Sequence, residues 1–358
     1  MMGRQRQPIL TNLIGALKDK ASQSKAAILS APDTSAIHLA VLRATTHGPS
    51  LPRDKHVSTL LSFGHGSRLL AASCVDALML RLHRTHDASV TLKCLIAIHN
   101  IIRRGAFILQ DQLSVYPATG GRNYLNLSKF RDDSSPEAWQ LSSWVRWYAR
   151  VLEQILFASR ILGYFFSAAS PVSPSDHGCK EMAEEKVSVL SNGDLLSEFD
   201  ALVGIVEEIC KAPEYGYVQE NRVVAEALRL VVDDNMMAQR EILVRVVELR
   251  ERFNCLSFGD SVELACVLKR LESCKQRLLF LSSIEKTMGG DALLCLVWDI
   301  KERIEAKEEN GDGRRAVRRD TKLSESARIG ERVPRSSYDS VRLPSGRLKP
   351  LLDLDSIA

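Results

Sequence analysis

Basic side chains gather in a short stretch near the N-terminus, where their types and spacing could bind an anion. Arg43 closes one apolar helical pattern, and Arg53, Lys55 and His56 open another after a proline-containing turn at 49–52. A turn of this length can bring all four side chains together. Helix N-termini favour phosphate oxygens, and Arg or Lys adds charge-assisted hydrogen bonds. The stretch therefore predicts a phosphate site; the alternative is a solvated turn whose charges bind nothing.

A second candidate for binding is an apolar and acidic peptide far along the chain. It comprises Leu351, Leu352, Asp353, Leu354 and Asp355. In an extended peptide, Leu352 and Leu354 would fill pockets of a partner while the carboxylates face its basic residues. Pro350 restricts the residue before it to extended conformations, which helps to present the peptide. The alternative is an amphipathic turn that folds back on the domain.

Side chains that could support catalysis or bind a metal do not form a recognised pattern. Gly64-His65-Gly66 lacks a preceding strand and a third spaced glycine, so a turn is a better interpretation than a dinucleotide loop. Four side chains could be considered as metal ligands: His83, His86, Cys94 and His99. Their irregular spacing favours satisfied core or surface positions. Because no P-loop, nucleophile elbow or HExxH motif occurs either, we expect no enzyme activity, no metal and no cofactor.

The elements that must position these residues are helices. From Leu10 to Lys307, apolar residues recur at helical intervals, and strict strand alternation is nearly absent. The clearest segments are 69–82, 92–102 and 144–162. The apolar residues of the first segment include Leu69 and Leu80. Proline and glycine interrupt the pattern at Pro49 and Pro52, Gly64 to Gly66, Gly120 and Gly121, Pro171 to Pro174, and Pro213 to Gly216. Many helices with short connections predict an all-α bundle or solenoid.

The first helical segment is amphipathic. Leu10, Leu13, Ile14 and Leu17 share one helical face. That pattern suits either packing on the core or lying in a bilayer interface. Because the apolar face is short, we prefer packing on the core.

Composition and charge limit the classes of function. Of 358 residues, 45% are hydrophobic and 26% are charged, and the formal net charge of +4 is too small to argue for bulk nucleic-acid binding. The eight cysteines show no CxxC pair, and most lie in apolar stretches where cysteine acts as a small hydrophobe, with a reducing cytosol as its simplest location. No stretch reaches the roughly 18 apolar residues of a membrane span. We therefore expect any membrane contact to be peripheral.

The character of the chain changes after Lys307. Residues 308–350 are rich in Arg, Ser, Gly and Asp and nearly lack spaced apolar residues, which predicts a disordered basic linker. A linker of about 43 residues has a root-mean-square span of about 35 to 40 Å. Residues 351–358 then carry the apolar and acidic peptide. The arginines from Arg314 to Arg319 leave a nucleic-acid-binding solenoid as an alternative.

The basic stretch resembles the phosphoinositide-binding signature of ANTH domains. Nine residues separate Arg43 from Arg53, and Lys55-His56 follows, which is similar to the family's basic residue, nine-residue spacer and Lys-rich end in His. Further matches are Lys93 to Ile96 with His99, Asn123 to Phe130, and Trp144 to Arg150. The resemblance points to the short plant members of the monomeric clathrin-assembly proteins.

This resemblance implies a fold and a set of functional residues. The fold would be an ENTH/ANTH-like right-handed helical solenoid at 10–307, with an ENTH-like core at about 10–166. The residues implied to bind phosphatidylinositol bisphosphate head groups are Arg43, Arg53, Lys55 and His56. The peptide at 351–355 would be a clathrin box that lies in a groove of the clathrin heavy chain. A similar short motif, Asp194-Leu195-Leu196, lies where Asp194 is expected to cap a helix, so we interpret it as structural.

The resemblance also implies a cellular role. The chain would be an endocytic adaptor at the cytoplasmic face of the plasma membrane, in clathrin-coated pits and vesicles. The family also implies that the protein binds vesicle-SNARE cargo, although no residues are assigned to that contact, and that it is found at the Golgi.

The sequence departs from the family's signature at three positions. Arg replaces Lys at 43 and 53, and Asp54, expected as an N-cap, stands where the family more often has Lys. Each lost cation would weaken lipid binding by about 1 kcal/mol. The alternative function is a helical protein-interaction scaffold without lipid binding.

Overall fold

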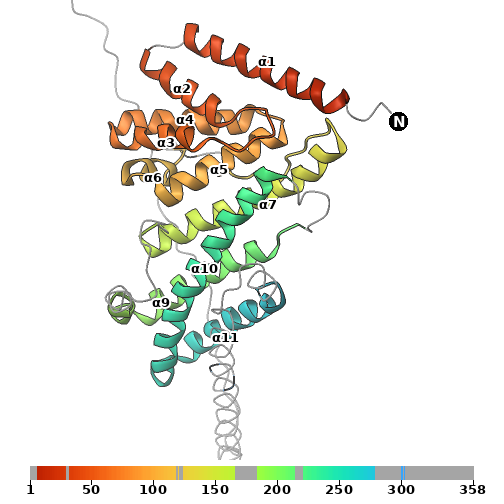
Figure 1. Ribbon diagram of the computed structural model, residues 1–358. Helices are drawn as coiled ribbons and strands as arrows, with labels where there is room; N and C mark the ends of the chain where they lie inside the picture. Colours follow the sequence, from red (N-terminus) through yellow and green to blue (C-terminus); the bar gives the residue numbers. More distant parts are fainter. Residues whose placement is uncertain are drawn as a thin grey trace, which may run out of the picture. The chain divides into compact units, whose positions relative to one another are not determined.

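The computed structural model is helical throughout the part of the chain that it describes. These residues are 6–29, 32–117, 120, 124–165, 184–213, 221–278, 300 and 302. The chain divides into two units, Met1–Lys307 and Glu308–Ala358, and all described residues belong to the first. They contain no strand, which confirms the all-α prediction (Figure 1). Among the described helices, none has the length and apolar character that a bilayer crossing requires.

The helices have clear bounds. In chain order they are α1 (Arg6–Leu29), α2 (Pro32–Ala44), α3 (Asp54–Ser62), η1 (Phe63–His65), α4 (Arg68–Arg84), α5 (Ala88–Arg104), α6 (Phe107–Ser114), α7 (Pro136–Leu162), α9 (Asn192–Cys210), α10 (Arg222–Glu251), η3 (Phe253–Cys255) and α11 (Phe258–Ser273).

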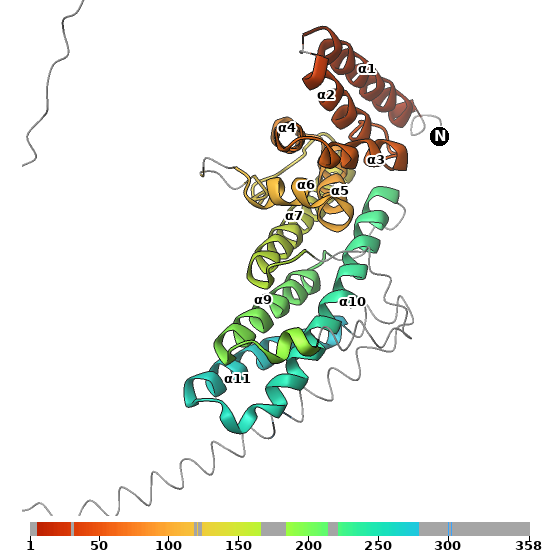
Figure 2. The same cartoon turned by 90° about the vertical axis from the view of Figure 1, so that its left-hand side faces the viewer.

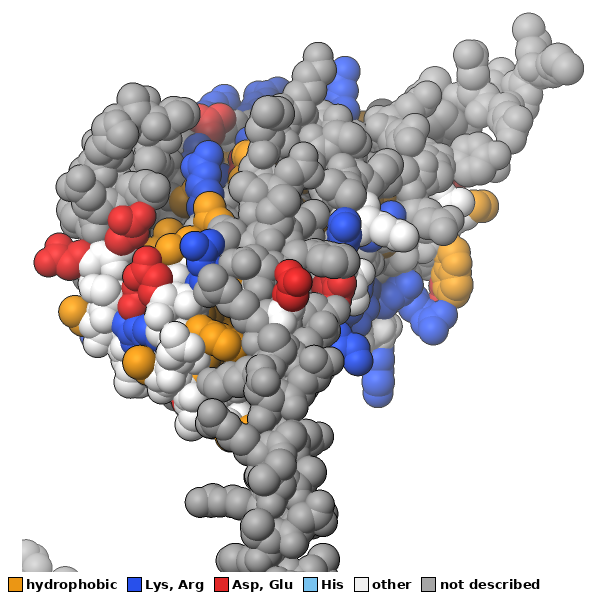
Figure 3. Space-filling view, turned by 90° about the horizontal axis from the view of Figure 1, so that it is seen from below, with side chains coloured by type: hydrophobic (Ala, Val, Ile, Leu, Met, Phe, Trp, Pro, Cys, Tyr) orange, Lys and Arg blue, Asp and Glu red, His pale blue; other side chains and the backbone are white. Residues whose placement is uncertain are grey.

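Neighbouring helices pack on one another along the first unit. Helix α1 packs on α2, α2 on α3 and α4, and α5 on α4 and α7. Helix α9 then packs on α7, α10 and α11, while α10 also contacts α5. Figures 1 and 2 show α1 and α2 at one end of this stack and α11 at the other. The end that carries α11, viewed in Figure 3, displays both acidic and basic side chains.

Helix α5 lies at the centre of the N-terminal half. Every residue from Val90 to Ile102 is buried, because this stretch is mostly apolar and its four polar side chains, Thr91, Lys93, His99 and Asn100, are buried with it. Its start is fixed by Asp87, whose carboxylate accepts a hydrogen bond of 2.9 Å from the Val90 amide. A helix buried in this way provides a rigid support for the elements around it.

The long α7 includes the predicted segment at 144–162 but begins eight residues earlier, at Pro136. Ser135 caps it by accepting a hydrogen bond from the Ala138 amide, and Pro136 occupies the first helical position. Gly163 ends it with a φ of 74°, a left-handed conformation that suits glycine.

Two capping predictions are wrong. Arg53, not Asp54, is the N-cap residue of α3, and Asp54 is the first residue of the helix. Ser191, not Asp194, is the N-cap of α9, because its hydroxyl accepts the Asp194 amide at 3.2 Å. The structural interpretation of the Asp194 motif is nevertheless confirmed, since both of its leucines are fully buried.

Some apolar residues do not face the core as predicted. Leu69 is 76% exposed and Leu80 is 40% exposed, because the buried stripe of α4 runs along other positions of that helix. On α1, Ile14 and Leu17 are 46% and 67% exposed, so the prediction that they pack on the core is wrong. The side chains of Leu10 and Leu13 lie outside the described residues. The face of α1 that packs inward instead carries Gly15 and Asp19.

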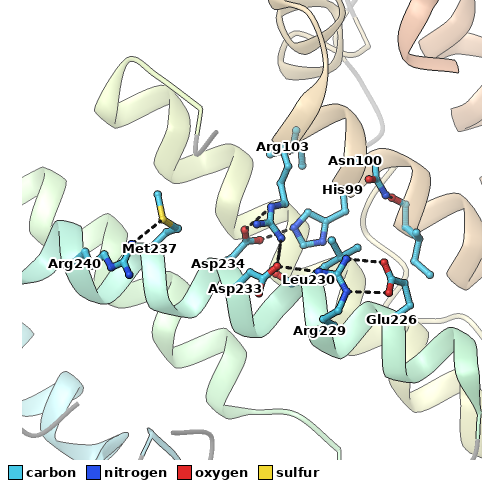
Figure 4. A network of polar contacts seen from close by, with 12 residues as sticks. His99, Asn100, Arg103, Glu226, Arg229, Leu230, Asp233, Asp234, Met237 and Arg240 are labelled. Carbon is cyan, nitrogen blue, oxygen red and sulfur yellow. Dashed lines mark hydrogen bonds and ion pairs between the residues drawn. The ribbon is translucent and has the colours of Figure 1, made fainter. Parts of the chain in front are cut away.

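A buried polar network joins α5 and α7 to α10 (Figure 4). His99 contacts the Tyr148 hydroxyl at 2.8 Å through Nδ1 and the Asp234 carboxylate at 2.5 Å through Nε2. Arg103 donates to Asp233 at 2.8 Å. Since buried polar groups are costly unless they are paired, this network fixes the register of α10. It also confirms that His99 is a satisfied core residue.

Candidate anion-binding site

The four basic residues predicted to bind an anion lie where α2 ends and α3 begins. Arg43 is in the last turn of α2, Arg53 is the N-cap residue of α3, and Lys55 and His56 are in its first turn. No side chain caps α3. The first amides of a helix have no partner within it, and they place partial positive charge at that end.

The charges of these side chains affect one another. The pKa of His56 lies below its usual value, first because the imidazole is partly buried and then because of the positive charges of Lys55, Arg53 and Arg43. All three cations therefore act on the same ring. Each of the three is exposed, and none forms an ion pair with another described residue. The three cations of the predicted cluster thus face solvent at the junction of α2 and α3; that they bind an anion stays a prediction.

The acidic residue inside the cluster points towards another partner. The carboxylate of Asp54 lies 3.6 Å from the guanidinium of Arg104, at the end of α5. Both groups are exposed, so the pair contributes little to stability. It nevertheless places a fourth cation, the guanidinium of Arg104, close to the one carboxylate of this stretch, which reduces the repulsion that an incoming anion would meet.

Two cations, of which Lys93 is buried and Arg81 partly exposed, hold the loop between α2 and α3. Arg81 of α4 donates to the Thr45 carbonyl at 3.2 Å. The ammonium of Lys93 donates to the Thr46 carbonyl at 2.8 Å and also to the Gly48 carbonyl. Lys93 is fully buried, and burial lowers its pKa to about 8 although Asp87 and Asp19 act in the opposite direction. At neutral pH it remains mostly protonated and can donate to both carbonyls.

Helix α1 fixes the same loop from another side. The backbone amide of His47 donates to Asp19 at 2.9 Å, and its Nδ1 lies 2.6 Å from the other oxygen of that carboxylate. The two segments approach so closely that a Cβ added at Gly15 would lie 2.9 Å from the Cβ of His47. Glycine is thus required at position 15, and the geometry of the cluster depends on α1.

Replacing Lys93 by methionine tests how the loop is supported. The side chain of Lys93→Met fits a similar volume but cannot donate to the Thr46 and Gly48 carbonyls. We expect the free energy of unfolding to fall by about 1 to 3 kcal/mol, the usual cost of leaving buried polar groups unpaired. Denaturant unfolding measures this change. Lys18→Met, at an exposed position, should change it by less than about 0.5 kcal/mol; equal effects would contradict the role of Lys93.

The lowered pKa of His56 predicts a pH dependence of anion binding. A bound anion favours the imidazolium and raises its pKa, so binding takes up a proton when the pH lies between the free and bound values. Affinity for a soluble inositol polyphosphate should therefore rise as the pH falls from about 7.5 to about 5.5. Calorimetric titration at several pH values measures this affinity for the wild type and for His56→Gln. The phosphates of the ligand titrate equally in both experiments, so the difference between the two pH profiles is due to His56. Identical pH profiles would contradict this prediction.

The supporting residues were not found from the sequence as parts of the site. Lys93 was noted only within a matching segment, yet a lysine inside the apolar run from Val90 to Ile102 is itself a signal that a buried ammonium needs partners. Asp19 and Arg81 gave no such signal. The peptide at 351–355 lies outside the described residues. Within the described residues, no three or more His, Cys, Asp or Glu side chains are grouped as metal ligands.

Two kinds of comparison relate this chain to known proteins. The family model described as ANTH domain matches residues 36–283, which include the basic cluster. An Arabidopsis thaliana protein named "Putative clathrin assembly protein" is 49% identical over 346 residues, covering 94% of this chain and 93% of the relative. A second protein of that name and species is 33% identical over 307 residues, covering 83% and 86% of the two chains.

A third Arabidopsis thaliana protein of the same name is 31% identical over 295 residues, covering 79% of this chain and 95% of the relative. All three names describe assembly proteins rather than enzymes, which agrees with the prediction that this chain is not an enzyme. The matched domain spans more than half of the sequence. The chain therefore belongs to the ANTH domain family.

Proposed function

We propose that this protein is an endocytic clathrin adaptor whose basic cluster binds phosphatidylinositol bisphosphate head groups. The observation that supports this most is that three exposed cations act on one imidazole beside an uncapped helix N-terminus. Phosphate oxygens of a head group could accept hydrogen bonds from Arg43, Arg53 and Lys55 and from the first two amides of α3, since the next two donate to the Arg53 carbonyl. A bisphosphate offers two such anions, which matches a cluster divided between two helices.

The second part of the proposal concerns clathrin. The relatives are named as clathrin assembly proteins, and residues 351–355 follow the clathrin-box pattern of large apolar and acidic residues. We infer that this peptide binds the clathrin heavy chain as an extended segment. Two weak contacts, one to lipid and one to clathrin, would then reinforce each other through effective concentration.

This function places the protein on membranes as a peripheral component. Its expected location is the cytoplasmic face of the plasma membrane, in coated pits and coated vesicles. We also propose that the protein binds vesicle-SNARE cargo and is found at the Golgi. Only the family resemblance supports these two parts of the proposal. The competing function is a helical scaffold that binds proteins without lipid, in which the same cations would be solvated.

Co-sedimentation with vesicles tests the proposal. The full chain is mixed with purified clathrin and vesicles that contain phosphatidylinositol bisphosphate, or with control vesicles of equal total charge made with phosphatidylserine. We expect the protein to pellet with the first vesicles only, and clathrin to pellet only when the protein is present. Equal pelleting with both vesicles would contradict head-group recognition, and no pelleting would favour the scaffold.

A further inference from the structure

Two cysteines that are 64 residues apart in the sequence meet where α9 and α11 end. Cys210 is the last residue of α9 and is half-buried, and Cys274 is the C-cap residue of α11 and is buried. The Cys210 sulfur lies 3.9 Å from the Cys274 carbonyl oxygen. Each thiol also shifts the pKa of the other. The sequence, which has no CxxC pair, does not show this proximity.

The two thiols differ in acidity. The interaction with the Cys210 thiol lowers the pKa of Cys274, and the nearby ammonium of Lys211 acts in the same direction, while burial opposes them. The pKa of Cys210 is raised, first by the interaction with the Cys274 side chain and then by burial. Since the thiolate is the reactive form of cysteine, Cys274 is the nucleophile of the pair and Cys210 lies ready to react with it.

The surrounding contacts keep the two helix ends together. Arg277, which follows α11, donates to the carbonyls of Cys210 and Ala212 at 3.2 and 2.6 Å. Within α11, Arg270 forms ion pairs with Asp200 and Glu207 of α9. These contacts hold the ends of α9 and α11 side by side and keep the Cys210 sulfur beside the backbone of Cys274, so little rearrangement is needed to join the two side chains.

We propose that Cys210 and Cys274 are a redox-sensitive pair that hydrogen peroxide converts into a disulfide between α9 and α11. The Cys274 thiolate attacks one peroxide oxygen, which breaks the O–O bond, releases hydroxide and leaves a sulfenic acid on Cys274. The Cys210 sulfur then attacks that sulfur, forms the S–S bond and expels the oxygen as water. Two thiols lose two electrons and two protons, and the peroxide becomes two waters.

This pair is reduced under ordinary cytosolic conditions, where thiol systems reverse such bonds. Oxidation would close a covalent loop that contains α10 and would restrict the separation of α9 from α11. The inference does not depend on lipid or clathrin binding, because none of these residues belongs to the basic cluster.

Thiol mapping of the full chain tests the pair. The reduced protein is treated with hydrogen peroxide, alkylated, digested without reductant and analysed by mass spectrometry. We expect a peptide that links Cys210 to Cys274, with both thiols lost together and several-fold faster than the exposed Cys255 and Cys266. In Cys210→Ser the link is lost, and dimedone should trap the sulfenic acid on Cys274. Cys266→Ser is the matched control and should leave the link unchanged.

Other outcomes would overturn the proposal. One is loss of the two thiols no faster than Cys255, and another is a link from either residue to Cys255 or Cys266. A link between two protein molecules would also exclude an internal pair. Because the wild-type map alone gives these results, a variant that fails to fold leaves the test intact.

Discussion

The double charge reversal Arg53→Glu/Lys55→Glu is expected to abolish pelleting with vesicles that contain phosphatidylinositol bisphosphate. Each residue changes from one positive to one negative charge, so four units of charge are lost beside the anionic surface. At about 1 kcal/mol per charge, binding weakens by about 4 kcal/mol, which is roughly a thousandfold. Both side chains are exposed at the start of α3, so the fold should persist and circular dichroism should be unchanged.

A control variant with the same change in net charge shows whether binding depends on the basic cluster or only on the overall charge of the protein. Lys269→Glu/Lys275→Glu makes the same change at exposed positions in and just after α11, at the opposite end of the helical stack (Figure 1). We expect this variant to bind vesicles like the wild type. If both double variants lose binding equally, the attraction is non-specific. If neither loses it, Arg53 and Lys55 do not form the lipid site.

The helices that support this site were predictable because their signals are local. Helices α5 and α7 follow from the apolar residues that recur at helical intervals in 92–102 and 144–162. The exposure of Leu69 was not predictable in the same way. An apolar residue on a helix indicates burial only if another element covers that position, and the sequence does not show which positions are covered.

The cluster itself was predicted from the spacing, but what fixes it was not. Only nine residues separate Arg43 from Arg53, and Lys55 follows two positions later. A single short loop between two helices is therefore enough to bring the three side chains near one another. The contacts that fix this loop join distant segments: Asp19 to His47, and Lys93 to Thr46. Long-range partners of this kind depend on how helices pack, and nothing in the local pattern specifies them. The link between His99 and Asp234 spans 135 residues and has the same origin.

Removal of residues 351–358 is expected to abolish clathrin recruitment and leave vesicle binding unchanged. The remaining domain retains every residue of the basic cluster, whereas the proposed clathrin peptide is lost completely. In the co-sedimentation assay, protein should still pellet with bisphosphate vesicles while clathrin stays in the supernatant. The charge-reversed variant should behave in the opposite way, binding clathrin in solution without binding vesicles.

Point substitutions show whether the peptide acts through its side chains. In Leu352→Ala/Leu354→Ala the residues proposed to fill pockets are truncated, and clathrin should be lost almost as completely as in the deletion, since buried apolar contacts dominate such peptide interfaces. Val341→Ala/Leu343→Ala makes a similar change outside the peptide and should recruit clathrin normally. Clathrin that still pellets with the deletion variant must be bound by residues before 351, and the two contacts would then not be separable along the chain.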